Sequence, residues 1–113
     1  QQGGQLHGTR LLKRDTVKLM TTNQLPKPLL PIQINQPPRK GVGFGYGFSI
    51  RMKKTDWGPG AKAGEYGWGG AASTHYWVHP TDELIVITLE QTMPYSFLTE
   101  WGVKKLIYEA VKN

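Results

Sequence analysis

The segment from Glu83 to Glu90 places the strongest constraint on the fold of this chain. It reads Glu-Leu-Ile-Val-Ile-Thr-Leu-Glu, which is rich in β-branched residues and almost continuously apolar. Such a run is typical of a strand that is buried on both faces of its sheet. A single helix covers only one of these faces. The pattern therefore predicts a second covering layer that is supplied from outside this chain.

Two further segments are predicted as strands. In residues 41–52, glycine or small residues alternate with larger apolar ones, a period of two that suits a strand approached closely by other backbone. The other segment contains Trp68 and ends at a turn over His79-Pro80-Thr81-Asp82. The turn-forming residues of 53–64 join the two segments. We therefore expect an α+β fold with three antiparallel strands.

Helices are predicted near both ends of the chain. A short N-terminal helix is expected over residues 14–22, with Asp15 replacing the weak cap offered by Lys13 and Arg14. A C-terminal helix is expected from Ser96, as N-cap, to Lys112. Its apolar stripe is predicted to pack on the sheet and contains Val103, Leu106, Ile107, Ala110 and Val111. Residues 25–40 contain five prolines and are predicted to be an extended connector.

Composition excludes several classes of function. The 113 residues are 38% apolar, which allows the modest core of one small domain or of a piece of a larger one. The net charge of +6 comes from dispersed basic residues and indicates a solvated surface rather than a nucleic-acid interface. The absence of cysteine excludes disulfides and thiolate metal sites. No stretch approaches the roughly 20 apolar residues that span a bilayer.

Trp68-Gly69-Gly70 is the candidate site. Two consecutive glycines let a main chain approach a ligand without Cβ atoms in the way. An amide at the edge of a strand can then donate a hydrogen bond to a developing oxyanion. The alternative interpretation is a tight strand entry with a packed tryptophan.

The run from Gly64 to Pro80 resembles one strand of the serine β-lactamases and penicillin-recognising hydrolases. In that superfamily the strand carries Lys-Thr-Gly or a related triplet. Trp68-Gly69-Gly70 occupies this place, as in the family VIII carboxylesterase-like branch near the class C β-lactamases. The order of features from the opening Gln5-Leu6-His7-Gly8-Thr9-Arg10-Leu11-Leu12 onward is similar to the last third of such a hydrolase.

The resemblance implies that residues 1–113 form a single partial domain, the C-terminal portion of a β-lactamase-like fold. It assigns substrate binding to Trp68, Gly69 and Gly70, and an oxyanion-hole amide to Ala71. It implies no catalytic residue within this chain, because the nucleophile motif Ser-x-x-Lys is absent. The serines Ser49, Ser73 and Ser96 are followed three residues later by Met52, Tyr76 and Thr99.

The resemblance also sets expectations for substrates and partners. Trp68 replaces the lysine of true β-lactamases, which favours an uncharged ester or amide over a β-lactam. No cofactor and no metal are expected. The expected partner is a complementary N-terminal segment of the same hydrolase, and self-association is a further possibility. The cellular location stays open, although a periplasmic or secreted bacterial parent fits the resemblance.

Other residues invite alternative interpretations. His75 is expected to be structural, because this superfamily uses lysine and tyrosine from motifs absent here, and His7 lacks the neighbours of a metal site. Lys54-Thr55 and Lys62-Ala63-Gly64 are weaker candidates for the triplet, since both fall in loop-like sequence. A stand-alone, non-catalytic binding module and a basic binder of nucleic acid or membrane surfaces remain as alternative functions.

Overall fold

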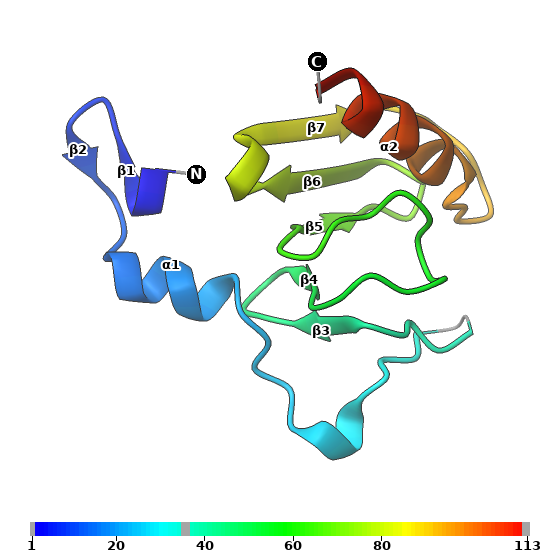
Figure 1. Ribbon diagram of the computed structural model, residues 1–113, viewed down its shortest axis with the longest axis horizontal. Coiled ribbons are helices and arrows are strands. Elements are labelled where there is room, and N and C mark those ends of the chain that lie inside the picture. Colours follow the sequence, from blue (N-terminus) through cyan, green and yellow to red (C-terminus); the bar gives the residue numbers. More distant parts are fainter. Residues whose placement is uncertain (1, 35–36, 112–113) are drawn as a thin grey trace.

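A computed structural model describes residues 2–34 and 37–111 and shows a small α+β fold (Figure 1). Its main sheet has five antiparallel strands in the order β3-β4-β5-β6-β7, and a separate two-stranded sheet pairs β1 with β2. The strands are β1 (Gln5–Leu6), β2 (Thr9–Arg10), β3 (Val42–Phe44), β4 (Ser49–Arg51), β5 (Tyr66–Gly69), β6 (His75–His79) and β7 (Leu84–Thr88). The helices are α1 (Arg14–Met20) and α2 (Leu98–Val111), with short 3-10 turns at Gln2–Gly4, Lys27–Leu29 and Pro80–Asp82.

The prediction of three strands in the main sheet was wrong, because two of the expected strands are hairpins. In residues 41–52 the chain turns between β3 and β4, where the N–H of Gly45 donates to the carbonyl of Phe48 and Gly47 has φ 91°. In the segment around Trp68 the chain turns between β5 and β6. The first turn lies within a run whose alternation continues across it, so periodicity alone did not separate its arms.

The N-terminal helix is present but shorter than predicted. It covers Arg14–Met20, and Lys13 precedes it without a side-chain capping hydrogen bond. Asp15 lies in the first turn, where its carboxylate favours the positive end of the helix, but it is not the cap. The connector 25–40, as far as it is described, contains one short 3-10 turn and an isolated bridge between Ile32 and Arg39.

Helix α2 lies against one face of the sheet, as the sequence predicted (Figure 1). The predicted contact stripe was right only for Val103 and Ile107, which are half-buried. Leu106, Ala110 and Val111 are exposed, while Lys104 and Tyr108 are buried. The inner line of α2 therefore carries polar and aromatic groups. Ser96 lies two residues before the helix, and its Oγ accepts a hydrogen bond of 3.2 Å from the N–H of Leu98. The predicted end at Lys112 falls outside the described residues.

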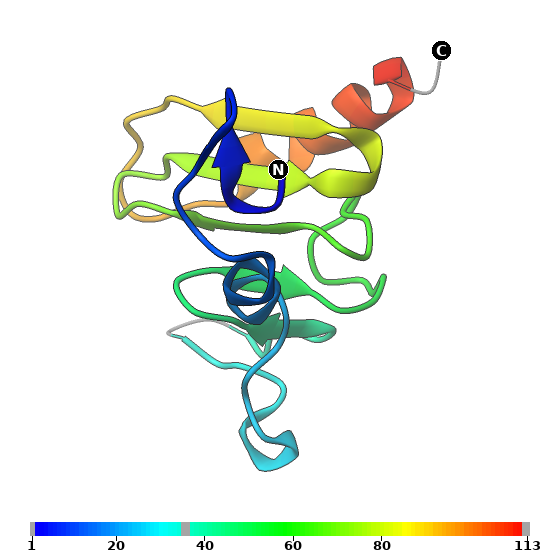
Figure 2. The same ribbon diagram turned by 90° about the vertical axis from the view of Figure 1, so that its left-hand side faces the viewer.

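The opposite face of the sheet is open at β7. Ile85 and Ile87 of β7 are 56% and 63% exposed, and β7 pairs with β6 alone. The hairpin of β1 and β2 stands before this face in Figure 2 without covering the whole of it. The expectation that β7 is buried on both faces thus fails within these residues, while the expected second covering layer is not part of the described chain.

Candidate functional site

The edge of β5 that faces β4 is unpaired beyond Gly67, where the predicted site begins. β6 pairs with all of β5, from Tyr66 opposite Val78 to Gly69 opposite His75. β4 pairs only with the first two residues of β5, Tyr66 and Gly67. The N–H of Gly70 donates to the carbonyl of Thr74 on the β6 side at 2.8 Å. Because successive strand residues point their N–H groups to opposite sides, the N–H of Gly69 faces the open edge.

Ala71 occupies the second position of a β-turn that follows β5. The turn is closed by the N–H of Ser73, which donates to the carbonyl of Gly70 at 3.0 Å. The second residue of such a turn does not use its N–H in the closing hydrogen bond. Ala71 is also exposed. Its N–H thus makes no backbone hydrogen bond among the described residues.

Ser73 anchors this turn to the segment that precedes α2. It is fully buried and has φ 66°, a left-handed conformation that glycine or asparagine adopts more readily. Its Oγ donates to the carbonyl of Thr92 at 2.8 Å and accepts from the N–H of Ser96 at 2.9 Å. The N–H of Thr92 donates to the carbonyl of Ala72 at 3.0 Å. Three hydrogen bonds thus fix the turn that presents Ala71.

The glycines of the candidate site sit where a side chain would not fit. A Cβ on Gly69 would lie 2.8 Å from both the hydroxyl of Tyr95 and Cδ2 of His75. A Cβ on Gly70 would lie 2.6 Å from Oγ1 of Thr74. Packing under the strand therefore favours glycine at both positions, most strongly at Gly69, which also approaches the backbone carbonyl of Thr74. The packing agrees with the alternative interpretation of the motif as a tight strand entry. The edge of β5 that faces β4 stays unpaired beyond Gly67.

Trp68 is only partly exposed, at 36%. Its ring meets that of Phe44 edge-on, with ring centroids 5.0 Å apart. The guanidinium of Arg39 lies 5.6 Å from the Trp68 ring centroid. Trp68 thus packs at the strand edge and exposes part of an apolar face beside a buried cation.

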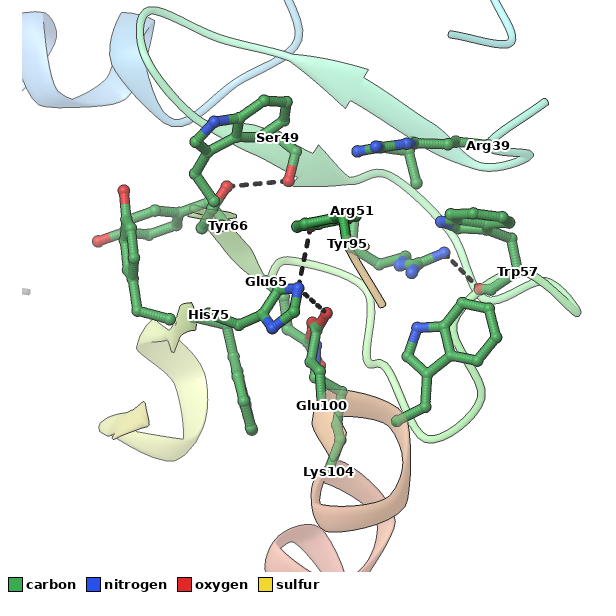
Figure 3. A pocket seen from close by; sticks show the side chains of 17 residues that line it. Arg39, Ser49, Arg51, Trp57, Glu65, Tyr66, His75, Tyr95, Glu100 and Lys104 are labelled. Atoms are coloured by element: carbon green, nitrogen blue, oxygen red, sulfur yellow. Dashed lines mark hydrogen bonds and ion pairs between the residues drawn. The ribbon is translucent and has the colours of Figure 1, made fainter. Parts of the chain in front are cut away.

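A buried polar cluster between the sheet and α2 was missed by the sequence analysis. It surrounds a cavity of about 60 Å³, shown in Figure 3. Lys104 of α2 is its centre, with Nζ 2.8 Å from Glu65 and 2.9 Å from Glu100. Lys104 also lies 4.4 Å from the ring centroid of Trp77. Buried charges need such pairing, because an unpaired charge in the interior is strongly disfavoured.

His75 belongs to the same cluster, which agrees with the structural role expected for it. It is 4% exposed, and its Nε2 shares a hydrogen bond of 2.9 Å with the hydroxyl of Tyr95. A Glu100 oxygen lies 3.6 Å from Nε2, and a Glu90 oxygen lies 3.9 Å from Nδ1. Burial is the main reason that the pKa of Tyr95 is raised, and Glu100 adds to this effect. Tyr95 therefore stays protonated and acts as a hydrogen-bonding group beneath Gly69.

The cluster gave weak signals in the sequence. Glu65 stands within the run that carries the candidate motif, but its partner Lys104 follows it by 39 residues. Only the spacing of Glu100 and Lys104, four residues apart on α2, predicts an ion pair.

The alternative triplet Lys62-Ala63-Gly64 lies away from the open edge of β5. Lys62 pairs with Asp82, and its Nζ lies 4.4 Å from the ring centroid of Tyr108. The hydrogen bond from Lys62 is the main cause that lowers the pKa of Asp82. His79 is buried here, with Nδ1 2.9 Å from the same carboxylate. This second cluster holds the loop before β5 against the turn after β6.

Within the described residues, no three histidine, aspartate or glutamate side chains are grouped as a metal site requires. None of the helices in residues 2–34 and 37–111 has the length and apolar character needed to cross a membrane.

Comparison with known proteins identifies the fold. The sequence matches no protein-family profile and no curated protein. A solved structure of simvastatin synthase, the LovD6 mutant of LovD from Aspergillus terreus, aligns with 90% of this chain at a TM-score of 0.67 and 23% sequence identity. LovD is an acyltransferase of the β-lactamase and penicillin-binding-protein superfamily. The chain spans 30% of that structure's length. It therefore has the fold of a fragment of a β-lactamase-like protein.

Proposed function

We propose that this chain is the C-terminal portion of a serine hydrolase that carries out acyl transfer on small esters or amides. In this proposal Trp68, Gly69 and Gly70 line the substrate position, and the N–H of Ala71 donates to the oxyanion. The nucleophilic serine and its lysine base belong to a complementary segment, meaning the rest of the same hydrolase outside these 113 residues. The resemblance to the class C and family VIII branch supports an ester in preference to a β-lactam.

The observation that carries the proposal is the open edge of β5 beyond Gly67. An extended acyl group can lie along this edge, as peptides do when they add to an exposed strand. The exposed amide of Ala71 follows directly, on a turn that three hydrogen bonds hold in place. Preorganised donors of this kind stabilise the negative charge that develops on a carbonyl oxygen during acyl transfer.

The proposed reaction has two steps with balanced proton transfers. The serine oxygen forms a bond to the substrate carbonyl carbon while its proton passes to the base, and the leaving group departs with a proton. Water then attacks the acyl-enzyme, giving the free acid and restoring the serine. Ala71 N–H donates to the carbonyl oxygen in both tetrahedral intermediates, so it acts twice in each cycle.

The open face of the sheet supports the partner named in this proposal. Ile85, Ile87 and Leu89 are 56%, 63% and 87% exposed, and the outer edge of β7 has no strand paired to it among the described residues. Apolar groups beside an unpaired strand edge favour contact with another polypeptide. The complementary segment would cover this face, whereas without it we expect self-association.

The proposal is tested by labelling and turnover. The purified chain, its intact mass verified, is treated with a fluorophosphonate probe and assayed with p-nitrophenyl butyrate, alone and with the complementary segment. We expect labelling and turnover only in the mixture, with the label on the complementary segment. Labelling of the 113-residue chain itself would contradict the assignment of the nucleophile. Absence of turnover in a mixture that forms a stable complex would instead favour the non-catalytic binding module.

A further inference from the structure

Two arginines with no carboxylate partner line the cavity under α2. Arg39 is 8% exposed, and its Nε has no hydrogen-bond partner. Its guanidinium lies 5.8 Å, 5.6 Å and 5.3 Å from the ring centroids of Trp57, Trp68 and Phe97. Arg51 uses NH1 to donate to the carbonyl of Trp57 at 2.7 Å. Aromatic rings attract a cation but accept few of the five hydrogen bonds that a guanidinium can donate.

The charged side chains that line the cavity are not all paired. Arg39, Arg51 and Lys104 contribute three positive charges, while Glu65 and Glu100 contribute two negative ones. Lys104 contacts both carboxylates at 2.8 Å and 2.9 Å. No ion pair within 4.0 Å joins Arg39 or Arg51 to a carboxylate of the described residues. Glu90 adds a third carboxylate beside His75, so the cluster as a whole is balanced, but neither guanidinium of the cavity lining has a carboxylate of its own.

Burial opposes the charge on both guanidinium groups. It lowers the pKa of Arg39, and nearby Glu100 and Tyr95 only oppose this effect. It also lowers the pKa of Arg51, against opposing effects of Glu65 and Glu100. Both side chains stay charged, because arginine remains protonated in proteins. An additional anion would remove this desolvation cost.

The cavity has the size and walls for one small anion. Its volume of about 60 Å³ is several times the roughly 10–15 Å³ that one water molecule occupies on this measure. Trp57, Trp68 and Tyr95 form part of its wall, and Arg39 and Arg51 line it together (Figure 3). A planar carboxylate matches the fork of a guanidinium, and it would give the two arginines the ion pair that they lack within the described residues.

We infer that this cavity is a binding site for a small carboxylate, held by Arg39 and Arg51 between the rings of Trp57 and Trp68. The carboxylate is either a free ion or part of a substrate that reaches in past Trp68, and the second source departs from the uncharged ester that the replacement of lysine by Trp68 favours. The binding of a free carboxylate does not depend on the proposed hydrolase function. A carboxylate that belongs to the substrate does rest on that proposed function.

Tryptophan fluorescence of the 113-residue chain tests the inference, because Trp57 and Trp68 form two of the walls. The chain is titrated with acetate at constant ionic strength, with chloride as the balancing ion and acetamide as the neutral analogue. We expect a saturable change with acetate alone. Arg39→Gln should weaken acetate binding by about tenfold or more, since hydrogen bonds to charged groups are lost. Arg14→Gln removes the same charge from an exposed position on α1 and should leave binding unchanged.

Arg39→Lys guards against a loss of folding in the glutamine variant. It keeps the charge but removes the fork, so we expect circular dichroism like that of the wild type and acetate binding that is weaker by several fold. Wild-type acetate affinity in a folded Arg39→Lys and Arg39→Gln pair would overturn the inference. An acetate response matched by acetamide would overturn it as well.

A second measurement distinguishes the two sources of the carboxylate. In the complex with the complementary segment, acetate should compete with an ester that carries a carboxylate but not with its neutral methyl ester, if the substrate supplies the group. Acetate binding without such competition assigns the site to a free ion. A complex that lacks turnover refutes the proposed hydrolase and the substrate source together, while acetate binding by the chain still tests the site itself.

Discussion

Replacing Ser73 with alanine should destabilise the fold far more than the loss of one hydroxyl on the surface. The side chain is fully buried, and it donates to Thr92 at 2.8 Å and accepts from Ser96 at 2.9 Å. Alanine leaves both backbone groups without their partner. Thr92 is exposed and Ser96 half-buried, so each lost hydrogen bond costs about 0.5–1.5 kcal/mol, and we expect the two together to lower the free energy of unfolding by about 1–3 kcal/mol.

Ser73→Gly separates the hydrogen bonds from the backbone conformation. Glycine loses the same two hydrogen bonds but adopts the observed φ of 66° without strain. The left-handed conformation costs a residue with a Cβ about 1–2 kcal/mol. We therefore expect Ser73→Gly to be more stable than Ser73→Ala by about 1 kcal/mol, even though it removes one more carbon atom.

Urea unfolding followed by tryptophan fluorescence measures these differences. Thr22→Ala is the matched control, because Oγ1 of Thr22 also donates at 2.8 Å and accepts at 3.1 Å but is exposed. We expect it to cost less than about 1 kcal/mol. The reasoning is refuted if Ser73→Ala costs no more than this control, or if Ser73→Ala is more stable than Ser73→Gly.

Three other perturbations probe the core. Lys104→Ala leaves the buried carboxylate of Glu65 and the half-buried carboxylate of Glu100 without their cation and should cost about 3–5 kcal/mol in urea unfolding. Lys105→Ala, whose side chain is 72% exposed, should cost less than about 0.5 kcal/mol. Equal effects would contradict the buried pairing. Gly67→Ala places a Cβ against the backbone carbonyl of Tyr76 and should lower the melting temperature, while Gly102→Ala, with open space around it, should raise stability by about 0.5–1 kcal/mol. Burial raises the pKa of Tyr108, so stability should be complete below the ordinary tyrosine pKa of about 10 and fall as pH rises above it, because the unfolded phenol ionises first. Tyr108→Phe should flatten that fall in urea midpoints measured between pH 8.5 and 10.5, and an unchanged slope would assign it to other groups.

The sequence was sufficient for the α+β class and for a β-lactamase-like fragment, whereas the candidate site at Trp68-Gly69-Gly70 stays a prediction. Alternating and continuous apolar runs predicted the strand segments, and the order of features predicted a β-lactamase-like fragment, which the structural comparison supports. Strand number was not predictable from periodicity. The β5–β6 hairpin turns at Ser73, a serine in a left-handed conformation that glycine usually occupies.

The polar cluster was not predictable, because its members break the usual pattern of burial. Lys104 lies on the inner face of α2 and is 4% exposed, while the neighbouring apolar Leu106 is 65% exposed. The pairing with Glu65 joins residues far apart in sequence. The exposure of β7 on the face opposite α2 also contradicts the apolar pattern of this strand, since Ile85 and Ile87 are more than half exposed in this chain. Such a conflict between pattern and exposure is what a partner polypeptide would resolve.

The central claim is that the amide of Ala71 is an oxyanion donor, and one pair of substitutions tests it directly. Ala71→Pro removes the N–H at a turn position that favours proline, and Ala71→Gly retains the N–H. Both variants are assayed with p-nitrophenyl butyrate in the complex with the complementary segment. We expect kcat/KM to fall by about 10²–10³ for Ala71→Pro, as for the loss of other oxyanion donors, and to stay near wild type for Ala71→Gly. Equal activity of the two folded variants would contradict the assignment.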